Sequence, residues 1–132
     1  MAMKYDGHEV RWHRRALALK SKSILLRVSI GELDKVGSTP LYEAIIRESR
    51  KAGLDGATIL RGVESYGASQ KLHSAKVLRL SENLPIVIEI VDSEQQIRPF
   101  VEKLDGMMER AGCGGLIALE KVEAIRHVNG SR

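Results

Sequence analysis

Apolar and polar residues alternate along the chain in four short segments, as they do in β-strands with one buried face. The first segment, 23–30, has an aliphatic residue at every second position. Three further apolar segments, 57–63, 85–91 and 116–122, have the length of ordinary strands. Because successive side chains of a strand point to opposite faces of a sheet, these segments predict four strands.

A helix is predicted between the first two strands. One side of this helix carries apolar and small residues together with one glutamate. These residues are Leu41, Ala44, Ile45, Glu48 and Ala52. Thr39 is the predicted N-cap, and Pro40 suits the first helical position because the N–H group that proline lacks would have no helical partner there. Gly53 is the predicted stop of this helix.

A second helix is predicted between the last two strands. Ser93 and Gln96 have the spacing of a capping box, and apolar residues then recur at helical spacing as far as Gly112. These residues are Ile97, Val101, Leu104, Met108 and Ala111. Pro99 lies beyond the first position of this helix, so we expect it to remove a backbone hydrogen bond and bend the opening turn.

The predicted order is strand, helix, strand, strand, helix, strand. This order predicts an α+β fold in which one four-stranded antiparallel sheet carries both helices on one face. The other face is not polar, because apolar residues accompany Arg27 on the first strand and Glu89 on the third. We expect these two strands to be neighbours and Arg27 to pair with Glu89. An apolar face with one charge pair is typical of a subunit interface, so we predict a homotrimer whose sheets face inward.

The segment 64–84, between the second and third strands, is long and has no helical stripe. Ordering its backbone costs entropy that few buried contacts return, so a connection of this length in a small domain is usually functional. It carries one aromatic and four basic or titratable side chains, Tyr66, Lys71, His73, Lys76 and Arg79. We interpret the segment as an arm that contacts a charged ligand or a partner.

The net charge of +4 is concentrated at the N-terminus. Residues 1–22 hold six basic and two acidic residues, which leaves fifteen of each sign in the remainder. The folded part therefore does not have the composition of a basic nucleic-acid-binding domain, and we expect no nucleic-acid partner. We divide the chain into a flexible tail at 1–22, one domain at 23–126 and a C-terminal tail at 127–132.

Composition also argues against several other classes of protein. The single cysteine, Cys113, has no partner within the chain for a disulfide, and no histidine partner that would activate its thiol is apparent. The chain has no apolar run long enough to cross a bilayer and no signal-peptide core, so we expect a cytoplasmic protein. Its histidines lack metal-binding partners at useful spacing, and no catalytic constellation is evident. We expect a non-enzymatic protein that requires no metal or cofactor.

Five segments of the sequence together resemble one known family. They are residues 31–34, 40–45, 53–69, 78–92 and 119–122, of which 53–69 is the most specific. On these motifs the region 23–126 is similar to the family catalogued as domain of unknown function 190, a branch of the PII-like signalling proteins. The resemblance implies a ferredoxin-like homotrimer that binds an adenine nucleotide, such as ATP, ADP, AMP or cyclic AMP, in clefts between subunits.

The same resemblance gives the arm a role. The arm at 64–84 corresponds to the T-loop through which PII proteins contact their targets, which implies an unidentified target protein such as a membrane transporter or channel. At the junction of strand and arm, Arg61, Gly62 and Gly67 resemble the phosphate-binding Lys/Arg-Gly-x-Gly segment of PII proteins. The chain departs from that segment at Val63 and Glu64.

A second phosphate-binding loop is implied before the last strand. The turn containing Gly112, Gly114 and Gly115 resembles this loop but lacks its lysines, for which Lys121 and Arg126 are the nearest substitutes. Polyphosphate binding needs backbone N–H groups that approach closely and a few fixed cations, which is the chemistry that these residues offer. Each of these glycines also has a structural explanation as a helix cap or turn residue.

Two other functions stay open. An RNA-binding module can have the same strand order, but aromatic residues make up only 4% of this chain and none lies in the middle of a predicted strand. An acylphosphatase-like enzyme also shares the topology. Its glycine-rich arginine loop should follow the first strand, where this chain has the acidic segment 31–34.

Overall fold

The computed structural model describes residues 23–65, 73–74 and 83–126. The predictions for the tail at 1–22, for most of the arm and for the tail at 127–132 lie outside the described residues. The main elements are β1 (Ser23–Gly31), α2 (Leu41–Lys51), β4 (Thr58–Arg61), β7 (Pro85–Ser93), α3 (Glu94–Ala111) and β8 (Leu116–Val122). Their order confirms the predicted arrangement of strands and helices.

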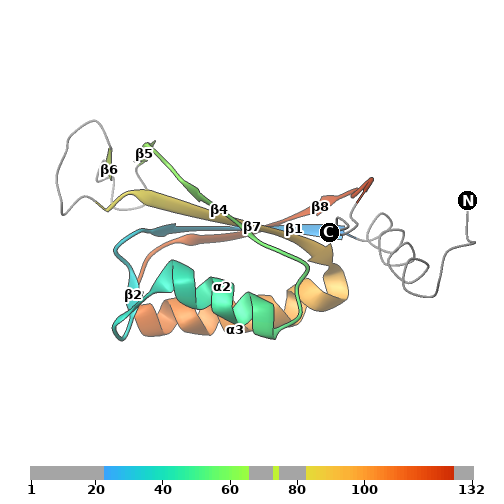
Figure 1. The fold of residues 1–132 in the computed structure, drawn as a ribbon, viewed down its shortest axis with the longest axis horizontal. Helices are drawn as coiled ribbons and strands as arrows, with labels where there is room; N and C mark the ends of the chain where they lie inside the picture. The colour runs from blue at the N-terminus through green and yellow to red at the C-terminus, as the bar shows by residue number, and fades with distance from the viewer. Residues whose placement is uncertain (1–22, 66–72, 75–82, 127–132) are drawn as a thin grey trace, which may run out of the picture.

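The four long strands form one antiparallel sheet in the order β4-β7-β1-β8. Both helices lie on the same face of this sheet, as Figure 1 shows. The α+β, ferredoxin-like fold predicted from the sequence is therefore confirmed. Two small hairpins were not predicted: β2 (Lys35–Val36) pairs with β3 (Thr39–Pro40), and β5 (Glu64–Ser65) pairs with β6 (His73–Ser74) at the start and middle of the arm.

The core lies between the helices and the central strands β1 and β7. Every second residue of these two strands is buried, as the alternation predicted. The helices contribute the other half of the core, from one face of each. The buried apolar residues are Ile24, Leu26, Val28, Ile30, Leu41, Ile45, Ile86, Ile88, Ile90, Ile97, Phe100, Leu104, Met107 and Met108. The edge strand β4 is shorter than predicted, and its four residues are exposed.

The start of α2 differs from the prediction. Thr39 pairs with Val36 in the β2–β3 hairpin and is not the N-cap, and Pro40 is the cap rather than the first helical residue. No side chain among the described residues caps this helix; instead the N–H group of Leu41 donates to the carbonyl oxygen of Asp34 at 2.8 Å. The preceding loop thus supplies a partner that a capping side chain would otherwise provide. The helix ends at Lys51, two residues before Gly53, as predicted.

The capping box at the start of α3 is only half formed. The Ser93 hydroxyl accepts the N–H group of Gln96 at 3.3 Å, as predicted. The reciprocal bond does not form, because the Ser93 N–H group donates to Oδ1 of the buried Asp92 at 2.7 Å. The Gln96 side chain donates to the carbonyl oxygen of Gly53 at 3.4 Å, which joins this helix start to the end of α2. Pro99 lies inside α3, as expected.

Candidate functional site at the base of the arm

The two ends of the arm meet at one corner of the sheet. The arm leaves β4 after Arg61 and returns to the sheet where β7 begins, next to β4 (Figure 1). The Gly62 N–H group donates to the carbonyl oxygen of Pro85 at 2.7 Å. The Glu32 N–H group donates to the carbonyl oxygen of Leu84 at 2.8 Å. The loop after β1 therefore touches the point where the arm returns.

Side chains strengthen this junction. The Arg61 guanidinium forms a short ion pair with the Glu32 carboxylate. The Leu33 N–H group donates to Oδ1 of Asn83 at 2.7 Å. We call this cluster, made of residues 31–33, 61–62 and 83–84, the arm base. Both ends of the arm are thus held by the same short segment after β1.

The glycines of the arm base have a packing reason. A Cβ atom at Gly62 would lie 2.6 Å from Cγ of Pro85, and a Cβ atom at Gly31 would collide with the side-chain amide of Asn83. Only glycine lets the chain segments approach this closely. Gly62, predicted as a phosphate-binding residue, is therefore required by the local packing whether or not it also binds a ligand.

The loop at 112–115 lies at the same end of the sheet as Arg61 but at the opposite edge. Leu116 of β8 pairs with Ser29 of β1. Arg61 of β4 pairs with Ile86 of β7, which pairs with Ile30 of β1, the residue next to Ser29. Strands β4 and β8 are separated by β7 and β1, so about 14 Å divides them at the usual strand spacing. Within one chain, the two predicted phosphate-binding segments do not meet.

The predicted cations lie even farther away. Lys121 pairs with Ile24, at the other end of β1, and Arg126 follows the end of β8. Ile24 and Ile30 are six positions apart on β1, which is about 20 Å of extended strand. The structure thus brings Arg61 and Gly62 together, but it places neither cation near them in the same chain.

The glycines of the loop differ in their local roles. Gly112 caps α3 with a left-handed φ of 63°, as predicted. A Cβ atom at Gly115 would lie 2.7 Å from the carbonyl oxygen of Ser29 and 2.7 Å from Cε of Met108. A Cβ atom at Gly114 would have none of the surrounding described atoms within 4 Å. Of the three, only Gly114 has no structural requirement evident among the described residues.

Cys113 lies inside this loop and is half-buried. Burial raises the pKa of its thiol, and the negative charge of Asp34 raises this pKa further. A raised pKa reduces the thiolate fraction at neutral pH, and the thiolate is the reactive form. The structure therefore gives Cys113 an environment that disfavours reactivity.

The helix-free face of the sheet carries the predicted charge pair. Nε of Arg27 lies 2.9 Å from Oε2 of Glu89, and the two residues are direct partners in the β1–β7 register, which confirms the prediction. The same face presents Leu60 of β4 and Leu116 of β8, which are 49% and 58% exposed. Neither helix lies over this face (Figure 1).

The predicted contact residues of the arm are mostly outside the described part of the chain. His73 lies in β6, opposite Ser65 of β5. The other predicted arm residues and one predicted phosphate-binding glycine lie outside the described residues; they are Tyr66, Gly67, Lys71, Lys76 and Arg79. Sequence reasoning missed Glu32 and Asn83 as members of the site. The acidic segment after the first strand could have indicated that Glu32 has a role, but nothing in the sequence predicted that Glu32 pairs with Arg61.

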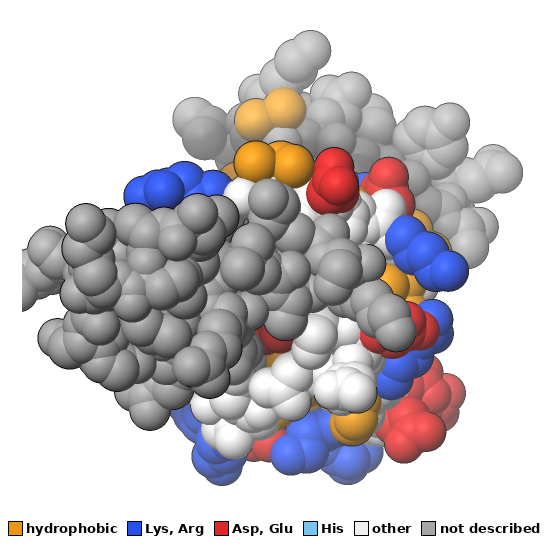
Figure 2. Space-filling view, turned by 90° about the vertical axis from the view of Figure 1, so that its right-hand side faces the viewer, with side chains coloured by type: hydrophobic (Ala, Val, Ile, Leu, Met, Phe, Trp, Pro, Cys, Tyr) orange, Lys and Arg blue, Asp and Glu red, His pale blue; other side chains and the backbone are white. Residues whose placement is uncertain are grey.

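The described surface mixes charges of both signs. In the view of Figure 2, Lys and Arg side chains lie next to Asp and Glu side chains along the edge of the molecule. Over residues 23–65, 73–74 and 83–126, no cluster of three or more histidine, cysteine or acidic side chains has metal-binding geometry. No helix in that part of the chain has the length and apolar character needed to span a membrane.

Comparison with known sequences gives a family and two relatives. The model of the DUF190 family, described as Uncharacterized ACR, matches residues 23–124. A UPF0166 protein of Aquifex aeolicus (strain VF5) is 35% identical over 104 residues, which is 79% of this chain and 94% of that protein. A UPF0166 protein of Methanocaldococcus jannaschii is 32% identical over 91 residues, which is 69% of this chain and 83% of that protein.

Comparison with solved structures gives PII-like proteins. A nitrogen regulatory PII-like protein from Thiomonas intermedia K12, bound to ADP, AMP and bicarbonate, has a TM-score of 0.62 at 16% identity; the match covers 79% of this chain and 89% of that one. A putative PII-like signaling protein from Thermus thermophilus has a TM-score of 0.54 at 16% identity, and the match covers 76% of this chain and 86% of that one. These similarities show that the folds are alike.

Proposed function

This chain belongs to the DUF190 family and has a PII-like fold, and on that premise we propose that it is a non-enzymatic regulatory protein that binds an adenine nucleotide between subunits of a homotrimer. The nucleotide changes the position or order of the arm at 64–84. The arm in turn contacts a target protein. The proposal also includes a cytoplasmic location, no required cofactor and a target such as a membrane transporter or channel.

The observation that carries the proposal is the arm base. Arg61, at the start of the arm, and Asn83, at its end, are both held by the segment that follows β1. A ligand phosphate that takes the Arg61 guanidinium from Glu32 therefore acts on the anchor of the whole arm. A ligand can shift such an equilibrium only by its different affinities for the two states, and the exchange of partners at Arg61 supplies that difference.

A site between subunits fits the distances within one chain. The loop at 112–115 is about three strand spacings from Arg61, so one chain cannot wrap both around the same phosphates. A neighbouring subunit that contributes its loop would complete the phosphate site, whereas its Lys121 and Arg126 lie at the other end of β8 and would contact another part of the ligand. The exposed leucines and the Arg27–Glu89 pair on the helix-free face offer the surface for such an assembly. The similar protein of Thiomonas intermedia, which is bound to ADP and AMP, supports the choice of ligand.

Calorimetry with ATP, ADP, AMP and cyclic AMP tests the proposal. We expect at least one of these nucleotides to bind the purified protein, and Arg61→Ala to weaken that binding by about tenfold, the usual effect of losing a charged hydrogen bond. Arg98→Ala is a matched control, because Arg98 is also an exposed arginine in an ion pair, with side-chain exposures of 57% and 59% for Arg98 and Arg61. No heat with any of the four nucleotides would remove nucleotide sensing from the proposal.

A further inference from the structure

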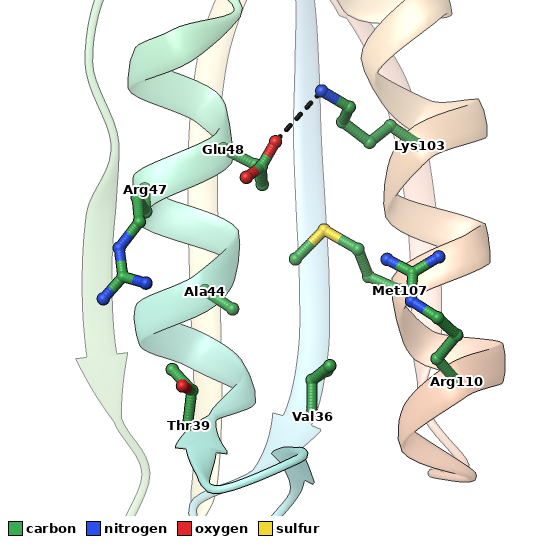
Figure 3. A pocket seen from close by; sticks show the side chains of 8 residues that line it. All are labelled: Val36, Thr39, Ala44, Arg47, Glu48, Lys103, Met107 and Arg110. Carbon is green, nitrogen blue, oxygen red and sulfur yellow. Dashed lines mark hydrogen bonds and ion pairs between the residues drawn. The ribbon is translucent and has the colours of Figure 1, made fainter.

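A groove on the helix side of the protein is separate from the arm base. It lies between α2 and α3 next to the β2–β3 hairpin and has a volume of about 300 Å³ (Figure 3). The residues that line it are Val36, Thr39, Ala44, Arg47, Glu48, Lys103, Met107 and Arg110. We call it the helix groove. Of the residues predicted to bind nucleotide, none that the structure describes lines it.

The floor of the helix groove is apolar. Figure 3 shows Ala44 of α2 and Met107 of α3 pointing into the space between the two helices, with Val36 below them. Met107 is only 3% exposed, so it belongs to the core and forms a fixed surface. An apolar floor of this kind favours a ligand with a hydrocarbon body rather than a bare inorganic ion.

The walls of the groove are positively charged. Arg47, Lys103 and Arg110 line it, with Glu48 as the single carboxylate in the lining. Within the described residues, neither Arg47 nor Arg110 has an ion pair or a side-chain hydrogen bond, whereas Arg27, Arg61 and Arg98 each have one. Figure 3 shows the Arg110 guanidinium on the α3 side of the groove and the Arg47 guanidinium on the outer side of α2, so Arg110 is the better placed of the two for an anion in the groove.

Glu48 does not neutralise these arginines. Its Oε1 accepts from Nζ of Lys103 at 3.0 Å, across the groove, and its Oε2 accepts from Nζ of Lys51 at 3.4 Å. The hydrogen bond from Lys103 is the main reason that the pKa of Glu48 is lowered, and Lys51 lowers it further. Glu48 therefore remains charged with both oxygens engaged by lysines, and the lining keeps an excess of positive charge.

From this combination we infer that the helix groove binds a small organic anion, a carboxylate or phosphate ester that carries an apolar body. The guanidinium group of Arg110, beside Met107 on α3, holds the anionic head, because planar guanidinium groups match the oxygens of carboxylates and phosphates. The apolar body lies on Met107. A volume of about 300 Å³ is at the small end of the range of ligand pockets, which limits the ligand to metabolite size. This inference does not depend on nucleotide binding at the arm base.

Binding of three probes to the full chain tests the inference. The probes are phenyl phosphate, benzoate and inorganic phosphate, titrated to millimolar concentration at constant ionic strength and followed by amide shifts in NMR spectra. We expect phenyl phosphate to bind more tightly than inorganic phosphate because it adds contact with the apolar floor. The amide shifts should centre on α2, α3 and the β2–β3 hairpin.

Charge variants identify the residues responsible. Arg110→Gln should weaken phenyl phosphate binding about fivefold, as expected for a charged hydrogen bond at an open site. Arg47→Gln should weaken it less, because the Arg47 guanidinium lies on the outer side of α2. Arg50→Gln is the matched control: it removes the same charge from α2, but Arg50 does not line the groove, and its variant should bind as the unmodified protein does. Arg98→Gln should also leave this binding unchanged, because Arg98 is an exposed arginine of α3 that does not line the groove.

Three results would overturn the inference. The first is the absence of binding by phenyl phosphate and benzoate at millimolar concentration. The second is an equal loss of binding in Arg50→Gln, which would show general attraction to a basic surface. The third is equal affinity for inorganic and phenyl phosphate, which would show that the apolar floor takes no part.

Discussion

Arg61 and Glu32 are 29 positions apart in the chain, yet their side chains form an ion pair that ties the start of the arm to the loop after β1. The Arg61 side chain is 59% exposed, and exposed ion pairs contribute only about 0–1 kcal/mol to stability. Such a pair is weak enough to be exchanged for a ligand. A nucleotide phosphate carries more charge than one carboxylate, so it can compete with Glu32 for Arg61.

The exchange of partners at Arg61 predicts a gain of affinity in one variant. Glu32→Gln removes the competing charge, so it should tighten nucleotide binding about threefold, in keeping with the small energy of an exposed pair. Calorimetry with the best-binding nucleotide measures this change. Glu43→Gln is the control, because Glu43 is an exposed carboxylate on α2 outside the arm base. Unchanged or weaker binding in Glu32→Gln would contradict competition at Arg61.

A site shared by two subunits predicts complementation between two defective chains. Arg61→Ala damages the arm base and Gly114→Glu places a charge in the loop, where open space accepts a side chain. In a mixed trimer one site combines the intact arm base of one variant with the intact loop of the other. Mixed trimers, purified through two different tags, should therefore bind one nucleotide each with the affinity of the unmodified protein, while each variant alone binds more weakly, by about tenfold for Arg61→Ala. Failure of the mixed trimers to regain this affinity would place the whole site within one subunit.

The helix-free face predicts how the assembly can be broken. Leu60→Glu puts a charge on that face and should convert the trimer to monomers, because an unpaired charge in an apolar interface carries a large desolvation cost. Light scattering should then fall from three times the chain mass of 14.6 kDa to that mass. Leu33→Glu is the matched control, since the exposed fractions of Leu33 and Leu60 are 48% and 49%. The interface assignment fails if unmodified protein is monomeric or if both variants dissociate alike.

The close approach at Gly115 predicts a difference between neighbouring glycines. Gly115→Ala should lower the free energy of unfolding by about 1–3 kcal/mol, because the added Cβ meets the Ser29 carbonyl and Met108 in a packed site. Gly114→Ala has open space and should change it far less. Urea denaturation at one protein concentration compares them. Equal stabilities of the two variants would show that the loop moves away from β1 without cost.

Cys113 predicts a loss of stability at alkaline pH. Its thiol pKa is raised in the folded state by burial and by Asp34, so the unfolded chain ionises first as pH rises. The contribution of this thiol is fully present below the ordinary thiol pKa of about 8.5 and is lost as pH rises through the folded-state pKa. Cys113→Ser has no group that titrates there. The stability of the unmodified protein relative to this variant should fall above that pH, and a constant difference from neutral to alkaline pH would contradict the raised pKa.

The alternation of apolar residues was enough to predict the bounds of three strands closely. The strand β8 begins and ends where the apolar run predicted, and β1 and β7 extend the predicted segments by only one or two residues. The helix-capping rules failed where a group other than the predicted capping residue became the hydrogen-bond partner of a backbone N–H group at a helix start. Asp34 supplies the acceptor for Leu41 at the start of α2, and Asp92 takes the Ser93 N–H group at the start of α3. Neither competition can be read from spacing alone.

The site divides in the same way. Arg61, Gly62 and the loop glycines were predicted because their residue types and order resemble a family motif. Glu32 and Asn83 were not found, since their importance comes from contacts with residues tens of positions away. The helix groove also went unnoticed, because its arginines belong to two helices that the sequence describes separately.

The amino-acid sequence alone determined the order of strands and helices, the buried face of the two central strands and the family of this protein, because periodicity and motifs act over short stretches of chain. It also indicated that Arg27 and Glu89 lie on the helix-free face and could pair if their strands were neighbours, and the β1–β7 register confirms this pairing. Only the tertiary structure placed Glu32 against Arg61, kept the loop at 112–115 away from both, and joined two helices into a charged groove. These relationships depend on where the packed core brings distant segments, and that is a property of the whole fold rather than of any local pattern.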